Sequence, residues 1–66
     1  MNKGRVKWYS EVKGYGFIVD DQSREIFMHH SNIEGDRFKQ LNENQEVRFD
    51  LYEKDGKYNA RNVRKL

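Results

Sequence analysis

Two short aromatic segments constrain the fold of this chain more than any other feature: K-G-Y-G-F-I at residues 13–18 and I-F-M-H-H at residues 26–30. Side chains alternate between the two faces of a β-strand. This alternation places the aromatic side chains on one face of each segment: Tyr15, Phe17, Phe27 and His29. It places aliphatic side chains on the other face: Ile18, Ile26 and Met28. Each segment therefore predicts a strand with one aliphatic face and one aromatic face.

The length of the chain decides which face is buried. Its 66 residues suffice for one small domain over residues 1–66, and 36% of them are charged. Only one face of each strand can enter so thin a core, and we expect the aliphatic face there. The aromatic faces then remain in solvent, with Lys7 and Lys13 beside them. Exposed rings next to cations are typical of surfaces on which nucleic-acid bases stack.

The rest of the chain continues the strand pattern. Alternating apolar residues and turn signals predict five short strands, at residues 3–10, 15–20, 25–30, 46–53 and 58–65. Ser31 to Glu34 has the capping-box form S-x-x-E, which predicts a short helical turn that starts at Ser31 and is ended by Gly35. Asp55-Gly56 predicts a tight hairpin turn. An open sheet would leave its edges exposed, so we expect an all-β fold, a small five-stranded antiparallel barrel.

The predicted core consists of inward-facing apolar side chains: Val6, Ile18, Ile26, Met28, Ile33, Leu41, Val47, Phe49, Leu51 and Val63. Ala60 is also expected to face inward. Val6 and Trp8 stand two residues apart, so a regular strand would direct both side chains to the same face. We therefore expect a bend or bulge near Trp8 that turns its ring outward.

Composition excludes several kinds of protein. The chain has no cysteine, so neither a disulfide framework nor a thiolate metal site can form. No apolar segment reaches the length of a membrane span and no signal-peptide pattern opens the chain. We therefore expect a cytoplasmic protein with no membrane partner. The net charge is only +2, but residues 1–19 hold a single acid, Glu11, against four cations: Lys3, Arg5, Lys7 and Lys13.

Neither a catalytic site nor a metal site is expected. Adjacent strand residues point to opposite faces, so His29 and His30 should not chelate one ion, even with Glu25 nearby. Asp20 and Asp21 have no histidine or lysine partner at catalytic spacing, and they indicate a solvated turn. A minimal nuclease would need a general base and usually a metal ion. We therefore expect no enzyme, no cofactor and no small-molecule substrate.

Three motifs resemble those of the bacterial cold shock protein family. The family's opening G-x-V-K-W-F-N corresponds to residues 4–10, its K-G-F/Y-G-F-I to residues 13–18, and its V-F-V-H-F-S to residues 26–31. The resemblance runs from Lys3 to about Lys65, nearly the whole chain. K-G-Y-G-F also matches an RNA-binding string of the RRM fold. An RRM needs two helices, however, for which this chain has no room.

The resemblance implies a five-stranded OB-fold barrel. It also implies binding of single-stranded RNA and DNA without ATP, and the melting of weak RNA structure as an RNA chaperone. Carried over by position, the family's binding surface comprises Lys7, Trp8, Lys13, Tyr15, Phe17, Phe27, His29, His30 and Phe38. Lys39 and Lys57 are expected to attract phosphates as well. The protein is expected to act as a monomer.

The chain also departs from the pattern of this family. His30 stands where an aromatic residue such as Phe is usual, and a pI of about 9.0 is unusual in a bacterial family that is often acidic. An alternative to nucleic-acid binding is an OB-type module that binds the ribosome or another protein. Such a module would ignore oligo-dT.

Overall fold

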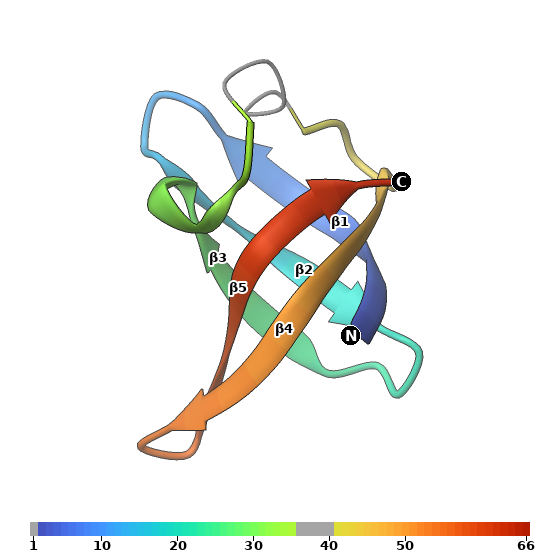
Figure 1. The fold of residues 1–66 in the computed structure, drawn as a ribbon, viewed down its shortest axis with the longest axis vertical. Helices are drawn as coiled ribbons and strands as arrows, with labels where there is room; N and C mark the ends of the chain where they lie inside the picture. The colour runs from blue at the N-terminus through green and yellow to red at the C-terminus, as the bar shows by residue number, and fades with distance from the viewer. Residues whose placement is uncertain (1, 36–40) are drawn as a thin grey trace.

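The computed structural model describes residues 2–35 and 41–66, which form five strands and one 3₁₀ turn (Figure 1). The elements are β1 (Asn2–Ser10), β2 (Tyr15–Asp20), β3 (Glu25–His29), η1 (His30–Asn32), β4 (Glu46–Lys54) and β5 (Lys57–Lys65). The five predicted strands are confirmed, with ends that shift by no more than one residue. Asp55 and Gly56 both have a positive φ, at 54° and 77°, as the predicted hairpin turn requires.

The strands close into a barrel in the order β1-β2-β3-β5-β4. β2 pairs with β1 and β3, and β4 pairs with β1 and β5, in each case antiparallel. β3 and β5 complete the ring through a parallel contact in which Phe27 lies opposite Asn59. The predicted closed barrel is therefore confirmed, and one of its five junctions is parallel. The β4–β5 pair crosses the front of the barrel in Figure 1, and β2 lies behind it.

The core is almost the one that the sequence predicts. The buried apolar side chains are Val6, Ile18, Ile26, Met28, Ile33, Leu41, Val47, Phe49, Ala60 and Val63. The prediction for Leu51 is wrong, because its side chain is half-buried and packs against this cluster rather than within it. The β4–β5 hairpin extends past the other strands (Figure 1). Leu51 lies in the second half of β4 (Glu46–Lys54). Its cross-strand partner Ala60 is buried instead.

A bulge in β1 turns Trp8 outward, as expected. The pairing with β2 shifts register between Val6, which lies opposite Ile18, and Trp8, which lies opposite Phe17. Val6 is consequently fully buried, whereas 39% of the Trp8 surface is exposed. Gly16 makes the close approach of the strands possible, since a Cβ there would lie 2.3 Å from the Trp8 carbonyl oxygen. No larger residue fits at Gly16 without moving backbone.

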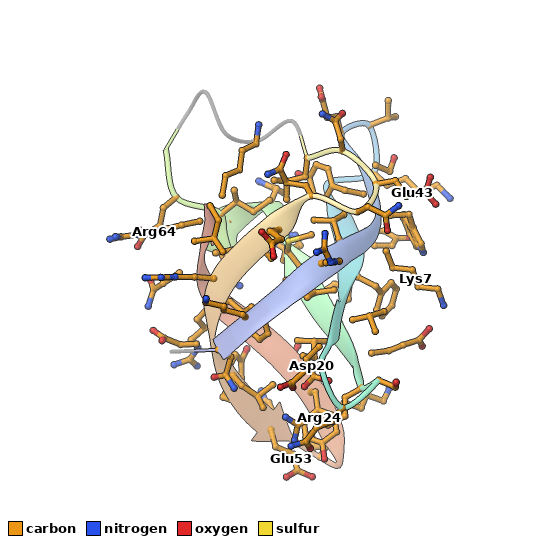
Figure 2. All side chains as sticks on the ribbon, turned by 90° about the vertical axis from the view of Figure 1, so that its right-hand side faces the viewer. Lys7, Asp20, Arg24, Glu43, Glu53 and Arg64 are labelled. Atoms are coloured by element: carbon orange, nitrogen blue, oxygen red, sulfur yellow. The ribbon has the colours of Figure 1, made fainter. Side chains whose placement is uncertain are left out.

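The turn between β2 and β3 is built on Asp20, which the sequence wrongly indicates as solvated. Asp20 is only 7% exposed. One of its oxygens accepts hydrogen bonds from the backbone N–H groups of Gln22 (3.0 Å) and Arg24 (2.9 Å). The other accepts from Arg24 Nε at 2.7 Å, and the two side chains face each other in Figure 2. A carboxylate at the end of a strand can thus be buried, because the turn itself supplies its donors.

These donors decide the protonation of Asp20. Burial is the largest single influence and by itself would raise the pKa of this carboxyl. The hydrogen bonds from Arg24 and Gln22, with the charge of Arg24, together hold the pKa below its ordinary value of 3.8. The folded state therefore favours the charged form of Asp20 more than the unfolded state does.

Replacing Asp20 by Asn should lower the stability of the protein and make that stability depend less on pH in the acidic range. A lowered pKa contributes stability that is complete above the unfolded pKa of about 3.9 and is lost as the pH falls through the folded value. We expect Asp20→Asn to lower the free energy of unfolding by about 1–3 kcal/mol at neutral pH. Between about pH 5 and pH 2, the free energy of unfolding should then fall less in this variant than in the wild type. Urea unfolding over this pH range measures both effects.

Asp21, the exposed residue next to Asp20, supplies the control for the urea unfolding experiment. Asp21→Asn removes the same charge one residue away and should change the free energy of unfolding by less than about 0.5 kcal/mol. Equal losses from the two substitutions would contradict the assignment of Asp20 as the centre of the turn.

The helical turn begins one residue earlier than the capping-box motif predicts. η1 starts at His30, and His29 is its N-cap residue, whose ring Nδ1 accepts from the Ser31 backbone N–H at 3.3 Å. Glu34 does not close a capping box. It lies beyond the turn and forms an ion pair with Arg64 of β5. A histidine ring thus takes the capping position that the sequence assigns to Ser31.

Candidate nucleic-acid interface

Five aromatic side chains on the outer faces of β1, β2 and β3 form one connected surface, the aromatic platform: Trp8, Tyr15, Phe17, Phe27 and His29. The cross-strand register produces it, because Phe17 lies opposite both Trp8 and Phe27, and Tyr15 lies opposite His29. Neighbouring ring centroids are 5.6 Å apart for Trp8–Phe17 and 5.7 Å for Phe17–Phe27. The sequence prediction of a shared aromatic face is thus realised as a continuous surface.

The rings of the platform touch one another but do not bury one another. Trp8 is 39% exposed, and the other four rings are half-buried. The planes of Phe17 and Phe27 meet at 74°, and those of Trp8 and Phe17 at 55°. Such edge and tilted contacts are favourable between aromatic rings. They also leave ring surface in solvent, on which a flat ligand can stack.

The two adjacent histidines lie together at one end of the platform. Their ring centroids are 4.4 Å apart, so the expectation that they point to opposite faces is wrong. β3 ends at His29 and η1 begins at His30, and the alternation of strand side chains ends with the strand. Gly14, with φ at 79°, lies against the His30 ring. A Cβ at this position would lie only 2.8 Å from His30 Cδ2, so a larger residue would displace the ring.

A shallow hollow adjoins this histidine end. It is lined by Tyr9, Glu11, Val12, Lys13, Gly14, His29 and His30. Lys13 is exposed at its rim. The Tyr9 ring packs against the core rather than joining the platform, and burial, with the nearby charge of Glu11, raises the pKa of its hydroxyl. Tyr9 therefore remains neutral at physiological pH and adds no charge to the hollow.

A second hollow adjoins the platform beside Phe17 and Phe27. It is lined by Phe17, Glu25, Phe27, Gly56, Lys57, Tyr58 and Asn59. Lys57 thus lies beside the platform although it comes from the β4–β5 hairpin. Sequence reasoning missed Tyr58 and Asn59, because only the closure of the barrel places β5 next to β3. No local motif marks that contact.

Lys7, one of the predicted phosphate contacts, forms an ion pair within the protein. Its Nζ donates a hydrogen bond to Glu25 Oε2, and both side chains are about half exposed. This ion pair connects β1 with the start of β3 at the edge of the platform. Phe38 and Lys39, the remaining predicted contacts, lie outside the described residues.

Two other kinds of feature are not found among the described residues. Over residues 2–35 and 41–66, no three His, Cys, Asp or Glu side chains gather where they could hold a metal ion. The same residues form no helix of the length and apolarity needed to cross a bilayer.

Fold and site together define a class of protein: a small five-stranded barrel that carries a connected aromatic surface on one side. Residues 2–66 match the family model of the "Cold-shock" DNA-binding domain. The chain therefore belongs to the cold-shock domain family, a family of nucleic-acid-binding proteins.

Curated relatives and a solved structure agree with this assignment. The chain is 44% identical to cold shock protein CspD of Bacillus subtilis (strain 168) and 42% identical to cold shock protein CspB of Geobacillus stearothermophilus, over the full length of each. It is 45% identical over 67 residues to the major cold shock protein of Micrococcus luteus, covering 100% of both chains. A solved structure described as "drosophila Unr CSD456" has the same fold, with a TM-score of 0.79 and 20% identity. The match covers 98% of this chain and 26% of that longer chain.

Proposed function

We propose that this protein binds single-stranded RNA and DNA by stacking unpaired bases on the aromatic platform, and that it thereby acts as an ATP-independent RNA chaperone. The observation that carries the proposal is the unbroken series of ring contacts from Trp8 to His29. Stacking on an aromatic side chain is worth about 1–3 kcal/mol per base and tolerates any base. Rings that lie side by side can take bases that follow one another along a strand.

Cations beside the platform complete the proposed mechanism. Lys13 lies in the hollow beside His29 and His30, and Lys57 lies in the hollow beside Phe17 and Phe27. Ammonium groups there attract the phosphates of a strand whose bases lie on the rings between them. Lys7 contributes less than the sequence predicts, because Glu25 already neutralises it.

Melting of weak RNA structure follows from binding alone. A paired base has no free face for the platform, so the protein binds the open form of a stem and shifts the equilibrium toward it. At a protein concentration 100-fold above Kd this shift is worth about 2.7 kcal/mol. A base-pair step is worth about 1.4 kcal/mol in DNA, so short stems open whereas long duplexes persist. No ATP is consumed, because the binding energy supplies the shift.

Short pyrimidine-rich single strands should quench Trp8 fluorescence, and a duplex of equal length should not. Trp8 is the one tryptophan of the chain, so its emission reports stacking on the platform itself. A weak stem-loop with a fluorophore and a quencher at its ends should open as protein is added without ATP. Titration of all three ligands under the same buffer conditions makes the comparison. Equal affinity for duplex and single strand would contradict the stacking mechanism.

A further inference from the structure

A row of three exposed cations crosses the side of the barrel formed by β1, β4 and β5. Lys3 lies directly opposite Arg48, and Arg48 lies directly opposite Arg64. All three side chains are exposed; we call this set the basic row. It faces away from the aromatic platform, since Arg64 and Lys7, at the platform's edge, point to opposite sides of the molecule in Figure 2.

The acidic side chains near the basic row already have partners. Glu46 forms an ion pair with Arg5 at 3.4 Å. Asp50 accepts a hydrogen bond from Asn62 Nδ2 at 2.9 Å. Glu34 pairs with Arg64 at the far end of the row. Within residues 2–35 and 41–66, Lys3 and Arg48 form no ion pair.

The row is unfavourable for the isolated protein. Like charges directly opposite each other on neighbouring strands destabilise a sheet, and here Arg48 lies between Lys3 and Arg64 on the strands to either side. Glu34 balances only the charge of Arg64. An anion laid across the strands would relieve this repulsion. The guanidinium group suits phosphate in particular, because its planar donors match phosphate oxygens in pairs.

A neighbouring arginine extends the same surface. The Arg61 guanidinium lies 3.9 Å from the centroid of the Tyr52 ring. A guanidinium stacked on a ring is attracted to it through its flat face and keeps its N–H edges available for other partners. The surface is otherwise poor in aromatic side chains, so it offers charge rather than stacking.

We propose that the basic row binds the phosphate backbone of a second nucleic-acid segment while the aromatic platform holds the first. This inference rests on the proposed function of the platform. Because the row contacts phosphates and not bases, it binds any sequence, and it binds paired and unpaired strands alike. The platform opens a strand on one side of the barrel, and the row keeps another segment close by on the other.

The dimensions of the barrel permit two strands at once. Its principal extents are 29 × 21 × 18 Å. Repulsion between charges in solution is screened over about 8 Å at physiological ionic strength, so backbones on opposite sides of the barrel hardly repel each other. A protein that holds both raises the effective concentration of one segment near the other, which favours their pairing after the first has been opened.

A two-strand capture experiment tests the proposal. A short single strand, long enough for one platform, is immobilised and loaded with protein. A second, non-complementary strand with a dye is then added at low salt. The wild-type protein should retain the dye, and Lys3→Gln/Arg48→Gln/Arg64→Gln should lose most of it. Trp8 quenching by the first strand should be unchanged in this variant.

Salt dependence gives a second readout. Each phosphate contact with a single strand contributes about −0.7 to the slope of log K against log salt. The two cations without an acidic partner, Lys3 and Arg48, therefore predict a slope of about −1.4 for retention of the second strand, and Arg64 brings it to about −2 where it exchanges Glu34 for a phosphate. The triple variant should lack this dependence. Arg48→Gln should show part of the effect, and Lys54→Gln, with the same charge loss at the end of β4, should show none.

The outcomes separate the two proposals. If the wild-type protein shows Trp8 quenching but captures no second strand, the basic row is not a binding surface. Capture that persists in the triple variant and in Arg48→Gln would also overturn the inference. Absence of Trp8 quenching would instead overturn the platform, whatever the row does. A melting temperature for each variant confirms that it is folded.

Discussion

Phe49→Ala is expected to remove a large part of the free energy of unfolding. Phe49 is the largest of the fully buried side chains and has no exposed surface. Truncating a buried phenylalanine to alanine costs about 3–5 kcal/mol, because the lost burial is compounded by the cavity left behind. A chain of this length has a total stability of only about 3–10 kcal/mol. Thermal and urea unfolding, followed by circular dichroism, measure the loss.

Phe17→Ala is the matched control for this experiment. It removes the same atoms from the outer face of the barrel wall, where the ring is half-buried, so its cost in stability should be the smaller of the two. Ile18→Ala and Val47→Ala remove fully buried side chains and should resemble Phe49→Ala, at about 1–4 kcal/mol each. If Phe17→Ala unfolded the protein while Phe49→Ala melted normally, the assignment of inner and outer faces would be reversed.

Phe17→Ala and Phe27→Ala should each weaken binding of a single strand by about 1–3 kcal/mol, the value of one stacked base. This corresponds to a loss of about 5-fold to 150-fold in affinity. Both rings lie inside the platform, where Phe17 touches Trp8 and Phe27, and Phe27 also touches Tyr15 and His29. Removing Phe27 therefore separates His29 from the other rings, whereas removing Phe17 takes one ring from the middle of the surface and leaves Trp8 connected to Phe27 through Tyr15. Titration of Trp8 fluorescence measures the affinity.

An aromatic residue outside the platform supplies the comparison for binding. Tyr52 is half-buried on β4, separated from Phe27 of the platform by strand β5, and packs against Arg61. Tyr52→Ala should leave the affinity of the first strand within about twofold of the wild type, since no base stacks there. A loss as large as that of Phe17→Ala would show that the platform is not the stacking surface.

Much of the fold could be predicted from the sequence because its signal is local. The period-two alternation in residues 15–20 and 25–29 assigns each side chain to a face, and the structure buries the aliphatic face as expected. The bulge near Trp8 could be inferred as well, because two residues of equal parity had to point in opposite directions. Each of these inferences needs only a few consecutive residues.

The wrong predictions, and the contacts that the sequence does not reveal, fall where a local rule stops or where distant residues meet. His29 and His30 lie side by side because the strand ends between them, and sequence alone does not fix a strand end to one residue. Asp20 is buried because the turn folds back over it. The ion pair of Lys7 with Glu25 joins residues 18 positions apart, and no pattern along the chain indicates it.

The parallel contact between β3 and β5 has a consequence for the motion of the barrel. Other neighbouring strands share ladders of several residue pairs, whereas these two share one pair among the described residues, Phe27 with Asn59. Regions held by few contacts open locally at low cost in free energy, so we expect the barrel wall to separate first at this seam. The seam runs beneath Phe27. Phe27 of β3 and Lys57 of β5 line the same hollow on either side of the seam. A nucleic-acid strand bound there as proposed would contact both strands, so we expect the bound strand to slow local opening of the barrel.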